Sequence, residues 1–424
     1  MNSINTVAAS PSHYSVNPKK DFTRHRIFDL KSILLNVIYL ESGSLKDELL
    51  KQFDFSFDTP SVSAFIQARS KVKVDAFSTI FNHFNESTHK NVLHKGYRLL
   101  AIDGSVLPIS NTFSDSETTV LKSNNSDIPF SAFHLNACYD LLEHTYEDLI
   151  IQGRTKMNEN LAFETMVKRY TGHRSIFIAD RGYESLNSFE TVRRSGNKFL
   201  IRVKDIHSRT SVLQSFGPFP DDEFDINVKR TLTRRYTNEI KAKKDQYKYM
   251  PQNQRFEYFD EKSFYEISFR VVRFKINEDT YESIITNLDR SEFSADEIKD
   301  LYQLRWEIET SFREIKYNLD LNTLHSKKRD LIKQEIYARL ILYNFSERMM
   351  REVELKKKKR KHKYQLNYVR AFHIIRKYLK EKRQKKLPPV ESLIAKEILP
   401  VRPNRHDPRK VKAKASIGFN YRYD

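Results

Sequence analysis

Three acidic residues and one charged helical segment carry the residue types that most readily do chemistry. Asp103 ends the apolar run YRLLAIDGS, and Asp180 ends a second run, RSIFIADRGYES. Each aspartate is closely followed by glycine, which lets the backbone turn and leaves room for a substrate. The third acid, Glu309, lies in the segment YQLRWEIETSFREIK, which runs from Tyr302 to Lys316.

The charged segment has helical periodicity in two adjacent rows. At 100° per residue, its apolar side chains share one face and four polar side chains lie directly beside that face. The apolar face holds Leu301, Leu304, Ile308, Phe312, Ile315 and Leu319, and the polar row holds Tyr302, Arg305, Glu309 and Lys316. A polar row in this place suits a helix that meets a cleft at the border of a sheet. The pattern equally fits an ordinary amphipathic helix with an Arg305–Glu309 pair, which contributes only about 0.2–0.5 kcal/mol.

The two aspartates favour the first interpretation. Three carboxylates from separate elements form an oxygen-rich site suited to Mg²⁺ or Mn²⁺. Two such ions about 3.5–4 Å apart activate a water or hydroxyl and stabilise the leaving oxygen in phosphodiester displacement. Beside such a site, Arg305 and Lys316 suit contacts to phosphate, and Tyr302 suits a hydrogen bond to phosphate or a stacking surface.

The elements that must position these acids predict an α/β fold. Residues 96–205 read as three strands, a helix, a strand, a helix and a strand. Adjacent strands pair antiparallel and strands joined through a helix lie parallel, which gives a mixed sheet flanked by helices. Residues 206–290 read as a β-rich insertion with an irregular basic stretch, KRTLTRRYTNEIKAKKDQYKYMPQ. Residues 291–350 return to the core, where Ser294 and Glu297 form a capping box that opens one helix running into the charged segment.

The two ends of the chain are expected to differ from this core. Residues 1–20 read as a disordered polar tail, and residues 21–95 as a helical N-terminal DNA-binding domain. Thr59 and Pro60 open a helix that carries Arg69. The helix suits either DNA reading or plain packing, since the segment that separates it from the preceding helix is longer than the turn of a helix-turn-helix motif. Residues 351–424 read as a basic helical C-terminal region whose Lys/Arg clusters suit the DNA backbone.

The balance of basic and acidic residues indicates which class of partner the protein binds. Among 424 residues, 74 Lys and Arg outnumber 55 Asp and Glu, so the formal charge is +19. This excess favours a nucleic-acid partner, although a generic basic protein remains an alternative. Cys138 is the only cysteine, so an intrachain disulfide is excluded, and its side chain is expected in the core. The spacing of the histidines does not indicate a zinc site. The sequence has no apolar run long enough to cross a bilayer, and its first residues lack the apolar region of a signal peptide. We therefore expect a cytoplasmic, nucleoid-associated protein without a membrane partner.

The spacing Tyr302-x2-Arg305-x3-Glu309-x6-Lys316 resembles the Y-R-E-K signature of DDE transposases encoded by bacterial insertion sequences. That family has an RNase H-like catalytic core similar to that of retroviral integrases. AIDGS around Asp103 and ADRGY around Asp180 resemble its two aspartate motifs. The resemblance extends over residues 22–421 and is strongest over 97–185 and 281–344.

The resemblance implies roles for individual residues. Asp103, Asp180 and Glu309 would be catalytic ligands of two Mg²⁺ ions, with Mn²⁺ as a substitute. The residues expected to contact DNA are Tyr302, Arg305, Lys316, Arg181, His325 and Lys327. Some relatives stack a tryptophan of the insertion on a flipped base, whereas the single tryptophan of this chain, Trp306, is expected to pack within the signature helix.

The resemblance also implies the activity. A homodimer on double-stranded DNA would cleave the terminal inverted repeats of a transposable element and join the freed 3′-hydroxyls to target DNA. Two alternatives remain open from the residues: a catalytically inactive DNA-binding protein derived from a transposase, and an RNase H-like metal nuclease that cuts without strand transfer.

Overall fold

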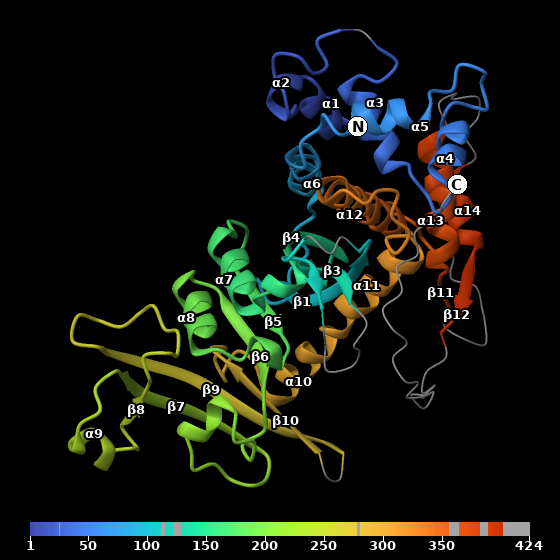
Figure 1. Ribbon diagram of the computed structural model, residues 1–424. Helices are drawn as coiled ribbons and strands as arrows, with labels where there is room; N and C mark the ends of the chain where they lie inside the picture. The colour runs from blue at the N-terminus through green and yellow to red at the C-terminus, as the bar shows by residue number, and fades with distance from the viewer. Residues whose placement is uncertain are drawn as a thin grey trace.

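The computed structural model describes residues 1–24, 26–111, 115–121, 129–277, 280–355, 364–381 and 389–401. Within these ranges, ten strands form one mixed sheet in the order β2-β3-β1-β5-β6-β10-β9-β7-β8, with β4 paired to β3 (Figure 1). The strands are β1 Arg98–Ile109, β2 Thr119–Val120, β3 Phe130–Asp140, β4 Thr145–Gly153, β5 Ser175–Ala179, β6 Lys198–Val203, β7 Phe224–Thr233, β8 Tyr247–Tyr249, β9 Phe264–Asn277 and β10 Thr280–Thr286.

The core of the sheet has the mixed pairing expected from the sequence. β3 runs antiparallel to β1, whereas β5 lies parallel to β1 and β6 lies parallel to β5. The parallel strands are joined through helices, as crossover connections require. The predicted α/β fold, an RNase H-like mixed sheet flanked by helices, is therefore confirmed.

The insertion extends the same sheet. β10 pairs antiparallel with β6, and β9, β7 and β8 follow outward from it. The basic stretch predicted to be irregular instead supplies the end of β7, the short helix α9 Asn238–Ala242 and β8. The reason is burial: Val228 and Leu232 of β7 pack against the hydrophobic core on one face of the sheet, which fixes a strand among charged neighbours.

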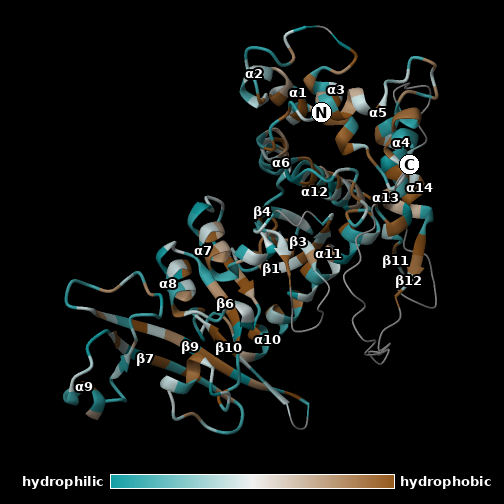
Figure 2. Cartoon of the chain, in the orientation of Figure 1, coloured by the Kyte–Doolittle hydropathy of each residue, from teal (hydrophilic) through white to brown (hydrophobic). Residues whose placement is uncertain are grey.

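Helices cover both faces of the core strands. α7 Glu159–Arg169 and α8 Leu186–Arg194 lie on one face, and α10 Ala295–Leu304, α11 Trp306–Tyr317 and α12 Arg329–Arg351 lie on the other (Figure 1). Along β1, Leu100 and Ile102 join the α7–α8 core while Leu99 and Ala101 join the opposite core. A strand buried on both faces needs a continuous apolar run, and Figure 2 shows hydrophobic residues along the central strands.

The N-terminal part is helical from its first residues. Its helices are α1 Asn2–Ala8, α2 Pro11–Tyr14, α3 Leu30–Ile38, α4 Leu45–Gln52, α5 Val62–Arg69 and α6 Asp75–Thr88. The prediction of a disordered tail over residues 1–20 is wrong, because Ile4 and Val7 of α1 are buried in the core that includes α3 and α6. α5 is capped by Ser61, whose side chain accepts from Ala64, rather than by the predicted Thr59.

Buried charges join these N-terminal helices to α12. The Arg69 guanidinium is 3.0 Å from Glu335 Oε1 and donates to Gln334 Oε1 at 2.9 Å. His325 is also buried here, with its Nδ1 3.1 Å from Glu335 Oε2 and its Nε2 3.1 Å from the carbonyl oxygen of Gly43. His325 is therefore enclosed in this structure, and its contact with DNA stays a prediction. α5 presents Arg69 to α12 in the packing role that was its alternative.

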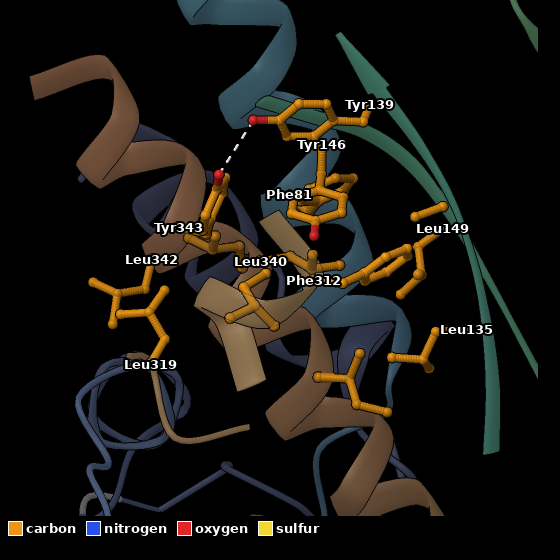
Figure 3. Close-up of a cluster of buried hydrophobic side chains, with 14 of the residues drawn as sticks. Phe81, Leu135, Tyr139, Tyr146, Leu149, Phe312, Leu319, Leu340, Leu342 and Tyr343 are labelled. Carbon is orange, nitrogen blue, oxygen red and sulfur yellow. Dashed lines mark hydrogen bonds between the residues drawn. The ribbon is translucent and has the colours of Figure 1, made fainter. Parts of the chain in front are cut away.

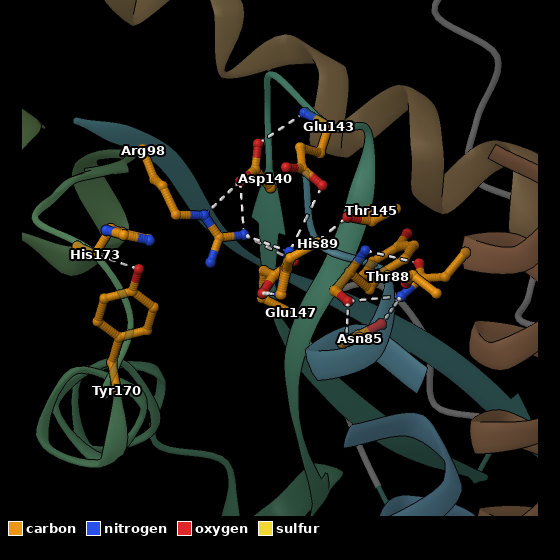
Figure 4. Close-up of polar contacts among 12 residues, drawn as sticks. Asn85, Thr88, His89, Arg98, Asp140, Glu143, Thr145, Glu147, Tyr170 and His173 are labelled. Carbon is orange, nitrogen blue, oxygen red and sulfur yellow. Dashed lines mark hydrogen bonds and ion pairs between the residues drawn. The ribbon is translucent and has the colours of Figure 1, made fainter. Parts of the chain in front are cut away.

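A second polar network fixes the start of β1 (Figure 4). The Arg98 guanidinium lies 2.7 Å from Asp140 Oδ2 and 3.0 Å from Glu147 Oε1. His89 Nε2 lies 2.9 Å from Glu147 Oε2, and although burial opposes its charge, Glu143 and Glu147 raise the pKa of His89 to about 9. The network ties the end of α6 to the β3–β4 hairpin and to β1.

The remaining short elements are η1 Arg154–Lys156, η2 Arg181–Tyr183, η3 Val212–Ser215, β11 Tyr364–Leu366, α13 Tyr368–Lys380, α14 Val390–Lys396 and β12 Ile398–Pro400. Most of the Lys/Arg clusters of the predicted basic C-terminal region fall at residues 356–363, 382–388 and 402–424, outside the described residues. No helix in the described part of the chain has the length and apolarity that crossing a bilayer requires.

Arg69→Met tests the buried link between the N-terminal helices and α12. The change leaves Glu335 buried without its guanidinium partner, so the free energy of unfolding should fall by about 3–5 kcal/mol. Urea denaturation measures the loss. The matched control, Lys229→Met, removes an exposed pair with Glu266 and should cost less than about 1 kcal/mol; equal losses in both variants would contradict a structural role for Arg69.

Candidate active site

The two aspartates lie side by side on neighbouring parallel strands. The last register pair of β1 and β5 is Ile102–Ala179, so Asp103 and Asp180 are the next residue on each strand, and adjacent strands lie about 4.8 Å apart. Asp180 follows the end of β5 as predicted, and its Oδ1 accepts from the amide of Gly182 at 2.7 Å. Asp103 does not end its strand, because β1 continues in register with β3 and places Asp103 opposite Ala137.

Helix α11 brings Glu309 over the same place. Its Ile308, Phe312 and Ile315 are buried in the core beneath the sheet. The Phe312 ring lies 5.9 Å from that of Tyr146, whose hydroxyl is 2.8 Å from Ser311 Oγ, and Figure 3 shows these aromatic side chains between α11, α12 and β4. This packing fixes the rotation of the helix. The helix is not continuous as predicted, since α10 ends at Leu304 and α11 begins at Trp306.

Arg305, at the break between the two helices, connects the predicted acids. Its Nη2 donates to Glu309 Oε1 at 2.9 Å, and its Nη1 lies 3.8 Å from Asp103 Oδ2. The side chain is enclosed, with the whole residue 2 % exposed. One guanidinium therefore holds a carboxylate of the sheet and a carboxylate of the helix within a single pocket.

The pocket carries more negative charge than Arg305 balances. Burial raises the pKa of Asp103, and the charges of Asp180 and Glu309 raise it further. The Gly104 amide and the Arg305 guanidinium oppose the rise, yet the pKa of Asp103 still reaches about 7. An added cation would stabilise the ionised form of a carboxyl group whose pKa is raised this far by burial and by neighbouring carboxylates.

The donor set suits a hard divalent cation. Asp103, Asp180 and Glu309 offer carboxylate oxygens, the ligand type that Mg²⁺ and Mn²⁺ prefer. Among the described residues, no three His, Cys, Asp or Glu side chains converge closely enough to hold an ion as they stand. In this arrangement the positive charge between Asp103 and Glu309 is the Arg305 guanidinium.

Three residues predicted to contact DNA lie in or beside this pocket rather than on the surface of the protein. Tyr302 and Arg305 are each 2 % exposed and therefore enclosed in this arrangement, and their contact with DNA stays a prediction. Lys316 is half-buried and donates to Ser105 Oγ at 2.7 Å and to the Val106 carbonyl at 2.8 Å, and burial lowers its pKa to about 8.

The other predicted positions are at the surface. Arg181 and Lys327 are exposed, and their contact with DNA stays a prediction. Trp306 is 50 % exposed, so the expectation that it packs within the helix is wrong. Its indole ring instead lies under the Arg305 guanidinium, whose central carbon is 4.8 Å from the ring centre.

Sequence reasoning missed three residues around the aspartates. His134 on β3, Glu159 at the start of α7 and Tyr183 in η2 all lie beside the glycines that follow Asp103 and Asp180. Tyr183 stands in the ADRGY motif and could have been noted there. His134 and Glu159 come from segments read only as a strand and a helix, and no local spacing signalled them.

Asp103→Asn should stabilise the protein when divalent cations are absent. The pKa of Asp103 in the folded state, about 7, exceeds its ordinary value of 3.8, so ionisation opposes folding increasingly as pH rises between these values. Asparagine carries no charge, and the variant should gain about 2–4 kcal/mol at pH 8 and clearly less at pH 5. Urea denaturation in EDTA at both pH values measures the difference; a gain that is equal at the two values would contradict the raised pKa.

Comparison with known proteins places this geometry in a family. A family model described as a transposase DDE domain matches residues 94–345. The transposase InsG of insertion sequence element IS4 from Escherichia coli (strain K12) is 24 % identical over 289 residues, which cover 66 % of this chain and 59 % of InsG. The putative transposase InsL of element IS186A from the same strain is 40 % identical over 58 residues, 14 % of this chain and 16 % of InsL.

A solved structure, the cryo-EM synaptic complex of piggyBac transposase with hairpin DNA, is 10 % identical with a TM-score of 0.46, covering 89 % of this chain and 76 % of that one. The present chain spans less than two thirds of the length of the curated relatives above. The family model covers more than half of the chain and includes Asp103, Asp180 and Glu309. This chain belongs to the family of transposases with a DDE domain.

Proposed function

We propose that this protein is a metal-dependent DNA transposase. It cleaves phosphodiester bonds at the ends of a transposable element and joins the freed 3′-hydroxyls to target DNA. The observation that carries the proposal is the single pocket in which Asp103 and Asp180 lie on adjacent strands and Arg305 links Asp103 to Glu309. Family membership supports the same activity.

In this proposal Asp103, Asp180 and Glu309 hold two Mg²⁺ ions, for which Mn²⁺ substitutes. Bound ions would supply Lewis acidity and an activated water or hydroxyl for phosphodiester displacement. The two aspartates are held by paired strands and by their own glycine amides, so their oxygens are positioned before substrate binds. Arg305 lies where it can exchange its Glu309 partner for a negatively charged DNA group.

Tyr302 is not the nucleophile in this mechanism. Burial raises the pKa of its hydroxyl to about 12, although the Arg305 and Arg202 charges oppose the rise. The hydroxyl therefore stays protonated at neutral pH, and it is enclosed at 2 % exposure. We infer that cleavage proceeds without a covalent phosphotyrosine.

Basic side chains beside Asp180 support a path for DNA. A cavity of about 730 Å³ lies between the α7–α8 layer and the insertion. The basic residues in its lining are Arg181, Lys204, Arg209, Lys248 and Arg255. The lining also includes Glu164 and Glu184, and Arg181 directly follows Asp180 along the chain, so the basic side chains suit DNA phosphates near the aspartates.

A second basic cavity supports DNA binding by the N-terminal domain. It measures about 780 Å³, and its lining includes Lys19, Lys20, Arg24, Arg26 and Lys71 without any acidic residue. We propose that this surface holds duplex DNA of the element's terminal repeat. Because an element has two ends, we further propose that a homodimer brings both ends together in one synaptic complex.

Glu309→Gln separates catalysis from DNA binding. Loss of one carboxylate from the pocket should lower the rate of Mg²⁺-dependent cleavage of the element's terminal repeat by about 10³-fold or more, since several kcal/mol of transition-state stabilisation are removed. Binding of the same duplex, measured by gel shift, should be nearly unchanged. Glu307→Gln is the matched control on the same helix, where Glu307 pairs with His144 instead.

The products of this experiment distinguish the proposal from its two alternatives. A DNA-binding protein without catalytic activity would shift the duplex but never cut it in any metal. A nuclease of this fold would cut, yet would not produce covalent joints between the element's 3′ ends and a target plasmid. Only cleavage followed by joining, both lost together in Glu309→Gln, agrees with transposition.

Arg181→Ala and Arg209→Ala test the basic cavity beside Asp180. If eight phosphates are neutralised in all, the logarithm of affinity should fall with the logarithm of salt with a slope near −7, and each variant should reduce that slope by about one unit. Fluorescence anisotropy over a salt series measures both. Lys229→Ala, on the exposed side of β7, is the control and should leave the slope unchanged.

A further inference from the structure

A fourth carboxylate approaches the two aspartates from the opposite face of the sheet. Glu159 is the first residue of α7, and the Asn158 side chain caps this helix by accepting from Leu161. α7 packs on the face of β1 that carries Leu100 and Ile102. Asp103 lies on the other face, the one that α11 covers, so Glu159 and Glu309 belong to different layers of the fold.

Two glycines open the sheet between Glu159 and the aspartates. A Cβ on Gly104 would lie 2.9 Å from Glu159 Oε1, closer than real side chains pack. A Cβ on Gly182 would lie 3.3 Å from Glu159 Oε2 and 3.0 Å from Asp180 Oδ1. One small space therefore separates an oxygen of Glu159 from an oxygen of Asp180, and any larger residue at position 182 would fill it.

His134 fixes the direction of the Glu159 carboxylate. Its Nε2 lies 3.0 Å from Glu159 Oε1. The imidazole is 3 % exposed, and neither ring nitrogen forms a well-aligned hydrogen bond with any described residue. With Oε1 engaged by His134, Oε2 is the oxygen turned toward Gly182.

A buried hydroxyl adds an independent indication that a ligand belongs here. Tyr183 is 1 % exposed, and its hydroxyl has no hydrogen-bond partner in the described part of the chain. Tyr183 directly follows Gly182, and its backbone amide donates to the Asp180 carbonyl oxygen at 3.1 Å. A donor buried in the turn after Asp180 without a bond for its hydroxyl is expected where a ligand or its bound water completes the set.

We propose that Glu159 is a fourth carboxylate ligand of the divalent-cation site formed by Asp103, Asp180 and Glu309, and that His134 is the positioning residue that holds it there. The inference rests on the proposed function, since it adds one donor to the same site. It assigns to the start of α7 a role in metal binding, whereas a purely structural Glu159 would only contact His134.

Mn²⁺ titration of the full chain, followed by electron paramagnetic resonance, provides the first test. Glu159→Gln should weaken Mn²⁺ binding about 10–100-fold, with the fold verified by circular dichroism. Glu307→Gln removes a carboxylate that also pairs with a histidine and should bind as the wild type does. If Asp103→Asn weakens binding and Glu159→Gln does not, the inference fails alone; if neither variant changes binding, the proposed metal site fails as well.

A thiol at position 159 tests direct ligation. Glu159→Cys in the presence of Cd²⁺, a metal that prefers thiolate, should give an ultraviolet thiolate-to-metal absorption that disappears when Asp103→Asn is added. The background is small, because the other cysteine, Cys138, is buried in the core. Glu307→Cys should give no such band, and absence of the band in Glu159→Cys would overturn the proposal even if Glu159→Gln does not fold.

The role of His134 is tested by a double-mutant cycle. His134→Gln should weaken Mn²⁺ binding in the wild-type chain and have no further effect in Glu159→Gln, because it acts only through that carboxylate. Additive losses would instead indicate a general structural role for His134 and would overturn its assignment as a positioning residue.

Discussion

Negative charge gathered at one point between two parallel strands and a helix is the constraint on which this structure depends. Asp103 and Asp180 are one strand spacing apart, and Glu309 reaches the same pocket from α11. Such a group repels itself unless positive charge enters it. In the present arrangement the Arg305 guanidinium supplies that charge, and burial of Asp103 makes its ionised form more costly. The scaffold must therefore hold the acids rigidly against their own repulsion.

The packing around α11 shows how that rigidity is obtained. Phe312 is fixed against Tyr146, and Tyr146 is fixed in turn by Ser311 and by the aromatic ring of Tyr343. Lys316, one turn beyond Phe312, donates to the backbone of β1 just after Asp103. The helix is thus attached to the sheet by aromatic packing on Tyr146 of β4 and by hydrogen bonds from Lys316 to β1. Repulsion between carboxylates is resisted by contacts that the carboxylates themselves do not make.

Much of the core and of the acid set could be predicted because both depend on local periodicity. The apolar runs predicted the strands, and the parallel orientation of β1 and β5 follows from the helical crossover that joins them. The same helical wheel also held information that was not used: Trp306 lies about 140° from Leu301 at 100° per residue, beyond the polar row, which fits its exposure. The exposure of Tyr302 and Arg305 was harder to predict, because residues beside the apolar face of a helix are buried or exposed according to the elements that pack against the helix.

Other features could not be predicted because their partners are remote in the sequence. Arg69 contacts Glu335, which lies more than two hundred residues away in the sequence, and His325 contacts the carbonyl oxygen of Gly43. Nothing near His325 distinguishes a buried imidazole from one at a DNA surface. The N-terminal helix α1 depends in the same way on a core built by later segments, so a polar sequence with Ile4 and Val7 reads as a tail until that core is known.

The two layers of helices explain why glycine follows closely after each of the two aspartates. Side chains alternate along a strand, so Asp103 faces α11 and the next residue faces α7. With any side chain at position 104, the sheet would separate the two layers completely at the level of the acids. Glycine leaves the backbone bare there, so Glu159 and His134 occupy space that a Cβ at position 104 would need. A sheet that is otherwise a barrier between two cores is open at this point, and the chemistry of the pocket can therefore draw on residues from both faces.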